Sequence, residues 1–134
     1  MKKIVLDTNV LVSSLLASGP PAAIVDLVAG GIIIPLYNDL IIVEYWNVLQ
    51  RPKFGFHSLQ VTQLVNNIIS AGIGVEVGTP STIYMKDEDD RKFYDLAEAY
   101  SAFLITGNLK HFPKMPFIVS PAEFLKEYIK SSSE

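Results

Sequence analysis

The segment Lys2-Lys3-Ile4-Val5-Leu6-Asp7-Thr8-Asn9-Val10-Leu11 decides how this chain folds. Its apolar residues 4–6 predict a buried strand, and that strand ends abruptly on the carboxylate of Asp7. A charge that leaves water needs a partner, so an acid at the end of a buried strand is costly unless something compensates it. Taken alone, Asp7 is typical of a turn residue or a helix cap.

Short apolar segments alternate with helical ones along the rest of the chain. Strands are predicted at 4–6, 32–34, 74–77, 103–106 and 117–119, and helices at 10–16, 22–29, 39–50, 58–70, 87–100 and 121–128. This alternation indicates an α/β fold with a parallel sheet covered on both faces. In such folds the functional site lies outside the carboxyl ends of the strands, where Asp7 and the turn at 106–108 both fall.

Length and composition set further bounds. The 134 residues predict a single domain over residues 1–130 and a disordered tail at 131–134. The absence of cysteine excludes disulfides and zinc–thiolate sites, and the net charge of −3 argues against a broad DNA-coating surface. No apolar run reaches the length of a membrane span, and the start lacks a signal-peptide pattern, so we expect a cytoplasmic protein.

A second acid, Glu44, lies on the predicted helix 39–50. That helix is apolar nearly all round, so we expect it to be buried. The nearest base on it is Arg51, two turns away. Either Glu44 pairs with a distant Lys or Arg or points into solvent, or it belongs to a functional site.

The acidic run 87–90 supplies the third acid. One or two of these carboxylates are expected to cap the following helix, where the helix dipole favours negative charge. Asp90 differs from the others because it begins the inward stripe that continues with Phe93, Tyr94 and Ala97. The Thr106-Gly107-Asn108 turn is open to two interpretations, plain turn chemistry or polar oxygens at the same sheet edge as Asp7.

Convergence of Asp7, Glu44 and Asp90 at one edge would be unfavourable without a cation. Two carboxylates about 4 Å apart repel by roughly 4 kcal/mol at an effective dielectric of 20. A hard divalent ion turns this repulsion into coordination, and oxygen ligands without Cys or His favour Mg²⁺ or Mn²⁺ over zinc. Such an ion activates water and polarises phosphoryl oxygens, so the implied reaction is phosphodiester hydrolysis.

Four motifs together resemble those of PIN domains, and in particular the toxin components of prokaryotic toxin–antitoxin pairs. The resemblance covers about residues 3–124 and rests on Leu6-Asp7-Thr8-Asn9-Val10, Glu44 within a helix, Asp89-Asp90-Arg91-Lys92-Phe93, and Ile105-Thr106-Gly107-Asn108. It implies a three-layer α/β/α sandwich around a parallel sheet and Mg²⁺- or Mn²⁺-dependent cleavage of single-stranded RNA. It also implies a cognate antitoxin as partner and self-association as a dimer or higher oligomer.

The resemblance assigns roles to individual residues. Asp7, Glu44 and Asp90 match the three metal-binding acids, and Asn9 and Thr106 match the residues that support them. Asn108 stands where many PIN domains have a fourth acid, so the pocket has one negative charge fewer and weaker metal binding is expected.

Basic residues near these motifs are candidates for contact with RNA phosphates, although ordinary solvated surface is an equally good interpretation. They are Arg51, Lys53, Arg91, Lys92, Lys110, His111 and Lys114, of which Arg51, Lys53, Lys92 and Lys110 are the preferred candidates. The main alternative to a ribonuclease is a binding module of the same fold with little hydrolysis, which Asn108 favours. A receiver-like phosphoacceptor is a further alternative, but the paired acids and late lysine that it needs are not clear in this sequence.

Overall fold

Five parallel strands form one sheet in the computed structural model, which describes residues 2–129. The strand order is β3-β2-β1-β4-β5, with β1 (Lys2–Leu6) in the centre. The other strands are β2 (Ile33–Tyr37), β3 (Ile73–Gly74), β4 (Phe103–Ile105) and β5 (Ile118–Val119). This confirms the predicted α/β fold. The predicted tail 131–134 lies outside the described residues, and the domain boundary at 130 stays a prediction.

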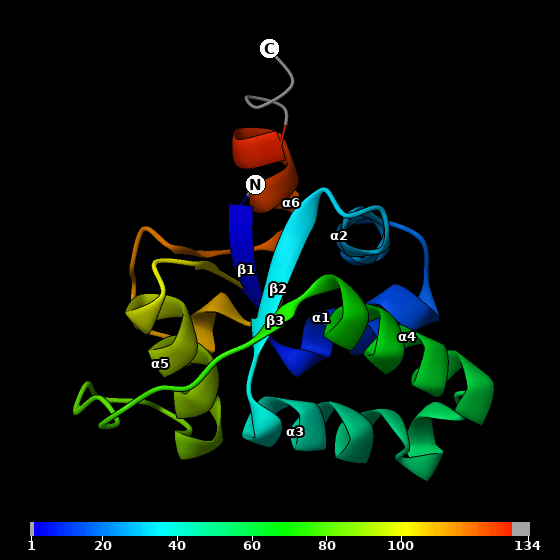
Figure 1. Cartoon of the computed structure of the whole chain (residues 1–134), viewed down its shortest axis with the longest axis horizontal. Helices are drawn as coiled ribbons and strands as arrows, with labels where there is room; N and C mark the ends of the chain where they lie inside the picture. Colours follow the sequence, from blue (N-terminus) through cyan, green and yellow to red (C-terminus); the bar gives the residue numbers. More distant parts are fainter. Residues whose placement is uncertain (1, 130–134) are drawn as a thin grey trace.

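Helices cover both faces of the sheet. They are α1 (Thr8–Leu16), α2 (Pro20–Ala29), α3 (Asp39–Leu49), α4 (Ser58–Ala71), α5 (Arg91–Ala99) and α6 (Pro121–Phe124), which a π-helical turn, η4 (Leu125–Ile129), extends. Short 3₁₀ turns occur at η1 (Pro52–Phe54), η2 (Glu88–Asp90) and η3 (Leu109–His111). In Figure 1, α5 lies on one side of the sheet and α1, α2 and α4 on the other, while α3 lies near the carboxyl ends of the strands.

Local sequence signals explain most of the element boundaries. Asn38 begins α3 because its Oδ1 accepts a hydrogen bond from the Ile41 amide at 3.0 Å. Strand β2 continues past Pro35, although proline lacks a backbone N–H. Pro35 is the last residue of β2 that pairs with β1, and Leu36 is the first that pairs with β3. A side chain at Gly72 is excluded, since a Cβ there would meet the Pro35 carbonyl oxygen at 2.2 Å. That close approach lets α4 turn directly into β3.

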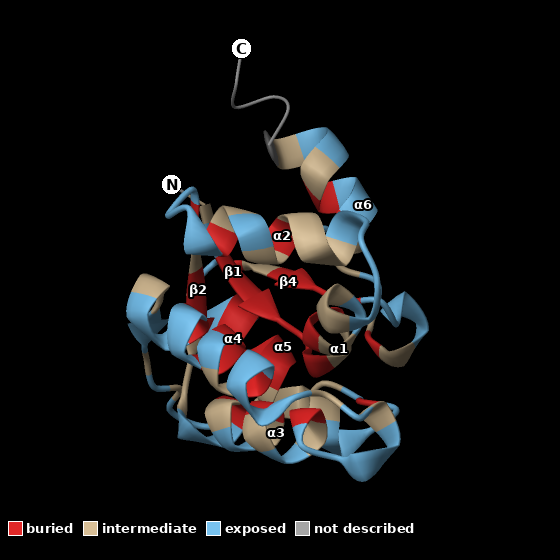
Figure 2. Cartoon of the chain, turned by 90° about the vertical axis from the view of Figure 1, so that its right-hand side faces the viewer, coloured by how far each residue is buried: buried red, intermediate tan, exposed pale blue. Residues whose placement is uncertain are grey.

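The core lies around the central strands. Figure 2 shows β1 and β4 buried between the helices, and Ile4, Val5 and Leu6 have no exposed surface. No single helix within residues 2–129 is long and apolar enough to cross a membrane; α1 and α2 together have the length and composition, but they are bent by 103°.

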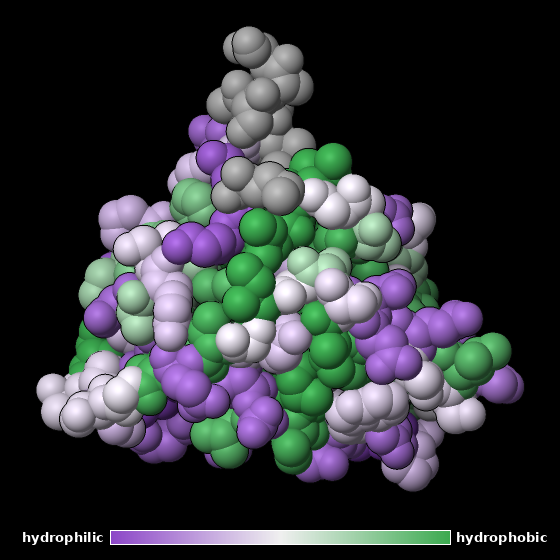
Figure 3. All heavy atoms as spheres, in the orientation of Figure 1, coloured by the Kyte–Doolittle hydropathy of each residue, from purple (hydrophilic) through white to green (hydrophobic). Residues whose placement is uncertain are grey.

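The prediction that the Glu44 helix is buried holds for only one of its sides. Helix α3 buries only the stripe Ile41, Tyr45 and Leu49, whereas Leu40 and Val43 are 67% and 55% exposed. The helix lies at the end of the sheet, so only one of its sides meets the core. Figure 3 shows apolar atoms gathered in a band over β2, β3 and the start of α3.

Candidate functional site

Asp7 lies at the carboxyl end of the central strand and is 5% exposed. Its amide continues the sheet by donating to the Ile105 carbonyl at 3.0 Å. One carboxylate oxygen, Oδ2, accepts hydrogen bonds from Asn9 Nδ2 at 2.9 Å and Thr106 Oγ1 at 2.8 Å. Burial raises the pKa of Asp7, and the charge of Glu44 raises it further, while the Thr106 and Asn9 hydrogen bonds oppose the rise.

Asn9 and Thr106 are themselves held by the turn that follows β4. Asn9 Oδ1 accepts from the Gly107 amide at 2.9 Å, and Thr106 Oγ1 accepts from the Asn108 amide at 2.9 Å. Each side chain therefore links the end of β1 to the end of β4 while it orients Asp7. The supporting roles that the resemblance assigns to Asn9 and Thr106 stay a prediction.

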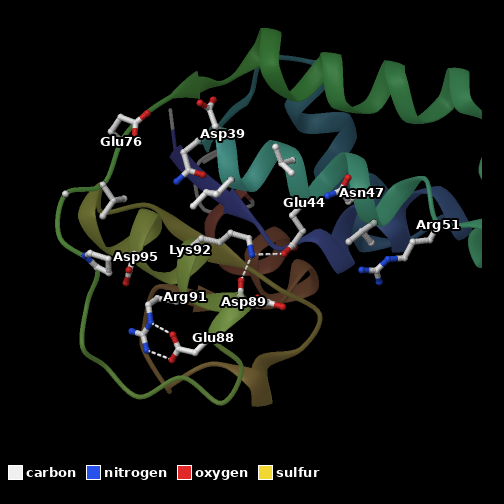
Figure 4. Close-up of a pocket in the computed structure, with 17 residues that line it drawn as sticks. Asp39, Glu44, Asn47, Arg51, Glu76, Glu88, Asp89, Arg91, Lys92 and Asp95 are labelled. Carbon is white, nitrogen blue, oxygen red and sulfur yellow. Dashed lines mark hydrogen bonds and ion pairs between the residues drawn. The ribbon is translucent and has the colours of Figure 1, made fainter.

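Glu44 projects from α3 toward the same edge, and it is paired. Its Oε1 lies 2.7 Å from the Lys92 ammonium, and its Oε2 accepts a short hydrogen bond from the Thr8 hydroxyl. Lys92 also donates to the Asp89 carbonyl, and Figure 4 shows it reaching across from α5 to Glu44. The distant base that the sequence left open is therefore Lys92, which was predicted to contact RNA.

Asp90 is the least satisfied of the three acids. Its side chain is 15% exposed, and its buried Oδ2 has no hydrogen-bond partner among the described residues. The nearest base is His111, whose Nδ1 lies 3.6 Å from that oxygen. Burial raises the pKa of Asp90 to about 6; the charges of Asp7, Asp87 and Glu44 add to the rise and that of His111 opposes it.

Another residue of the acidic run 87–90 caps the helical turn. Asp87 Oδ1 accepts from the Asp89 amide at 3.0 Å and so begins the η2 turn. The α-helix starts only at Arg91, later than the sequence predicts, because η2 forms the first turn as a 3₁₀ helix. Asp90 is thus left without a capping role.

Tyr45 contributes to the site in a way that the sequence did not indicate. Its hydroxyl donates to the Leu6 carbonyl at 2.6 Å, which joins α3 to the residue before Asp7. Burial raises the pKa of Tyr45 well above its usual value, and the charges of Asp7 and Glu44 raise it further. The available signal was its place beside Glu44 on the buried stripe, but an aromatic residue there is equally typical of a core.

Two grooves lie close to the carboxylates, one lined by Glu44 and the other by His111, the neighbour of Asp90. The α3–α5 groove, of about 750 Å³, includes Glu44, Asn47 and Arg51 in its lining. The η3 groove, of about 460 Å³, includes Asn108, Lys110 and His111. Lys53 lines neither groove, and its ammonium lies 5.1 Å from the centre of the Phe54 ring.

The donor set fits a hard divalent cation, but the side chains are not closed around one. Within residues 2–129, no three His, Cys, Asp or Glu side chains are close enough together to hold a metal ion as they stand. Asp90 nevertheless has a buried oxygen without a hydrogen-bond donor among the described residues. The charge of Glu44 raises the pKa of Asp7, and the charges of Asp7 and Glu44 raise the pKa of Asp90. Asp7, Glu44 and Asp90 would hold Mg²⁺ or Mn²⁺ once Glu44 releases Lys92.

Comparisons with known proteins agree with this geometry. A family model described as PIN domain matches residues 3–110, which include Asp7, Glu44, Asp90 and Asn108. An uncharacterized protein of Methanocaldococcus jannaschii, MJ1680, is 28% identical over 109 residues, which cover 79% of this chain and 70% of that protein. No solved structure matches the chain. PIN domains are generally nucleases that use divalent metals, and this chain, matched over most of its length, belongs to the PIN domain family.

Proposed function

We propose that this protein is a Mg²⁺- or Mn²⁺-dependent endoribonuclease that hydrolyses phosphodiester bonds in single-stranded RNA. One observation carries the proposal: Asp7 after β1, Glu44 on α3 and Asp90 on η2 face the carboxyl edge of the sheet, and Asp90 has a buried oxygen with no hydrogen-bond partner among the described residues. Such an arrangement raises the free energy of the metal-free protein, and clusters of perturbed acids are typical of functional sites.

Each residue of the proposed site has its own role. Asp7, Glu44 and Asp90 would hold the ion, which when bound activates water and polarises the phosphoryl oxygen. Thr106 and Asn9 hold Oδ2 of Asp7, so this carboxylate keeps one orientation. Asn108 offers an amide oxygen beside them that can accept a hydrogen bond from water. Water attacks phosphorus directly, so no covalent enzyme intermediate is needed.

Cleavage of a fluorescent single-stranded RNA tests the proposal. We expect cleavage with Mn²⁺ or Mg²⁺ and none with EDTA. Asp7→Asn should lose more than about 100-fold in rate, the upper end of losses for residues that merely support a metal ligand. The matched control is Asp26→Asn, which removes an exposed acid on α2. Cleavage that survives EDTA, or that persists in Asp7→Asn, would contradict the proposal.

A second candidate is a PIN-fold module that binds RNA or a partner protein with little hydrolysis. Asn108 favours it, because the pocket has one carboxylate fewer, and so does the Lys92 ammonium on Glu44. Asn108→Asp separates the two candidates. A large gain in cleavage indicates a weakened site, whereas no gain in an active protein indicates that the native pocket is competent.

The biological setting is also proposed. We propose that the protein is the toxin of a toxin–antitoxin pair, acts in the cytoplasm, and self-associates. The cognate antitoxin would place a basic side chain in the acidic pocket. Failure of any product of a neighbouring small gene to bind or inhibit the protein would contradict this role, and light scattering measures the oligomeric state.

A further inference from the structure

The η3 groove differs from the rest of the site in its charge. Lys86 and Lys110 both line it, and no aspartate or glutamate does. Both lysines are exposed. The groove also contains the side chain of Leu109, which is 42% exposed, and its volume of about 460 Å³ lies within the range of roughly 300–1,000 Å³ typical of ligand pockets. It therefore has room for a nucleotide and not only for an ion.

Lys86 is held at this groove by the segment that precedes it. Met85 is only 5% exposed and anchors the segment in the core. Further back, the Ser81 amide donates to Asp95 Oδ2 at 3.2 Å, and Arg91 Nη1 donates to the Ser81 carbonyl at 2.9 Å. These contacts tie the backbone that precedes Lys86 to α5, and Lys86 itself lines the groove.

The η3 groove is continuous with the carboxylate site through His111. This residue lines the groove, and its Nδ1 lies 3.6 Å from Asp90 Oδ2. Asn108 lines the groove as well, and its backbone amide donates to the Thr106 hydroxyl that supports Asp7. A phosphate group in the groove would therefore lie next to the bond that is cut.

The α3–α5 groove has the opposite character. Six acidic side chains and three basic ones line it, and two of the three bases are already engaged (Figure 4). Arg91 pairs with Glu88 at 2.7 Å, and Lys92 pairs with Glu44 at 2.7 Å. Only Arg51 has no ion pair among the lining residues, so this groove repels a phosphate backbone.

We propose that the η3 groove binds the phosphate of the nucleotide adjacent to the scissile bond, with Lys86 and Lys110 as its charged contacts and Leu109 beneath the sugar or base. The RNA strand then leaves the site over η3 and not through the α3–α5 groove. The inference rests on the proposed ribonuclease activity and identifies its substrate-binding residues. No role was predicted for Lys86 from the sequence, and the RNA contact predicted for Arg51 is not part of this proposal.

Binding of a labelled single-stranded RNA, measured by fluorescence anisotropy in EDTA, tests the subsite without cleavage. We expect Lys86→Ala and Lys110→Ala each to weaken binding about 5- to 10-fold at low salt. Each should also reduce the slope of log K against log salt by about 0.7, the value for one phosphate contact with a single strand. The matched control is Lys3→Ala, which removes an exposed lysine at the amino end of β1 and should stay within twofold. Arg51→Ala tests the other groove, and a loss of binding as large as that of the two lysine variants would contradict the proposed path.

The result can be separated from the fate of the nuclease proposal. The binding assay contains EDTA, in which the proposed nuclease does not cleave, so it measures the subsite independently of catalysis. If no cleavage is found but binding depends on Lys86 and Lys110, the nuclease proposal fails and the subsite stands. If the wild type does not bind RNA at low salt, or if the lysine variants bind within twofold of it, the subsite proposal is overturned. Thermal unfolding of each variant verifies its fold, and Lys86→Glu, with a larger expected loss, provides a second variant.

Discussion

The Lys92 ammonium pairs with Glu44, the carboxylate proposed as a metal ligand. Removal of this ammonium is therefore expected to strengthen metal binding. We predict that Lys92→Met tightens Mn²⁺ binding about tenfold. In the wild type the incoming ion must displace the ammonium before Glu44 becomes a ligand, and the ammonium then remains nearby and repels the ion. Methionine removes both effects. It also keeps an unbranched stem beside Phe93, whose ring centre lies 5.2 Å from the Lys92 ammonium.

The magnitude follows from the geometry of the pair. At 2.7 Å and an effective dielectric of 20, the Coulomb attraction is about 6 kcal/mol. Desolvation cancels most of it, and hydrogen bonds to charged groups contribute a net of roughly 1.5–3 kcal/mol. The side chains of Lys92 and Glu44 are 17% and 24% exposed, so solvent screening favours the lower end. A free energy of about 1.4 kcal/mol corresponds to a factor of ten in affinity.

Isothermal titration with Mn²⁺ measures the affinity, and the Mn²⁺-induced rise in Tm provides a second readout. In EDTA we expect Lys92→Met to melt below the wild type, because Glu44 loses its partner, and in Mn²⁺ to gain more. Arg91→Met is the control, since it removes a charge from the adjacent residue, which pairs with Glu88 and not with Glu44. Equal or weaker Mn²⁺ binding by Lys92→Met, or an equal gain in Arg91→Met, would refute the reasoning.

Three further predictions concern the residues around Asp7. In EDTA at pH 8, Asp90→Asn should be more stable than the wild type by roughly 1–2 kcal/mol after solvent screening, because the pKa of Asp90 rises from 3.8 to about 6 on folding. This gain in stability should shrink as the pH falls from 6 to 4. Urea unfolding that shows no such trend contradicts the raised pKa. Thr106→Val should lower the free energy of unfolding by about 1–3 kcal/mol, because it removes a hydrogen bond from Asp7 and leaves the Asn108 amide without its acceptor. The same change should raise the pKa of Asp7 further, so Mn²⁺ binding should weaken more at pH 6 than at pH 8, and an equal loss at both would argue against it. Tyr45→Phe should cost about 1–2 kcal/mol, because the Leu6 carbonyl loses its donor, and an unchanged urea midpoint would show that this bond contributes little.

The parts of the site that the sequence predicted depend on neighbours close along the chain. Asp7 follows directly from the β1 strand, and the Asp87 cap lies next to the helical turn that it begins. The parallel order of elements then places the β4 turn beside Asp7, because both follow strands at the same edge of the sheet. Each of these inferences needs only a local pattern and one general rule of α/β folds.

The missed features involve residues that are distant in sequence or depend on what covers a surface. Glu44 and Lys92 are 48 residues apart, and no periodicity indicates that α5 directs its lysine toward α3. The exposure of Leu40 and Val43 was missed for a related reason, since composition does not reveal that only one side of α3 meets the core. The position of Lys86 depends on the burial of Met85 and on contacts of Ser81 with α5, which are all tertiary.

The metal-free site already contains its own compensation for the converging acids. Lys92 neutralises Glu44, and the raised pKa of Asp90 leaves this carboxyl partly protonated near pH 6. Asn108 adds no charge, so the remaining negative charge is that of Asp7. Its Oδ2 accepts two hydrogen bonds. An ion that used Glu44 and Asp90 as ligands would have to displace the Lys92 ammonium and, at low pH, a proton. We therefore predict that metal binding at the proposed site is coupled to the release of Lys92 from Glu44 and strengthens as the pH rises through 6.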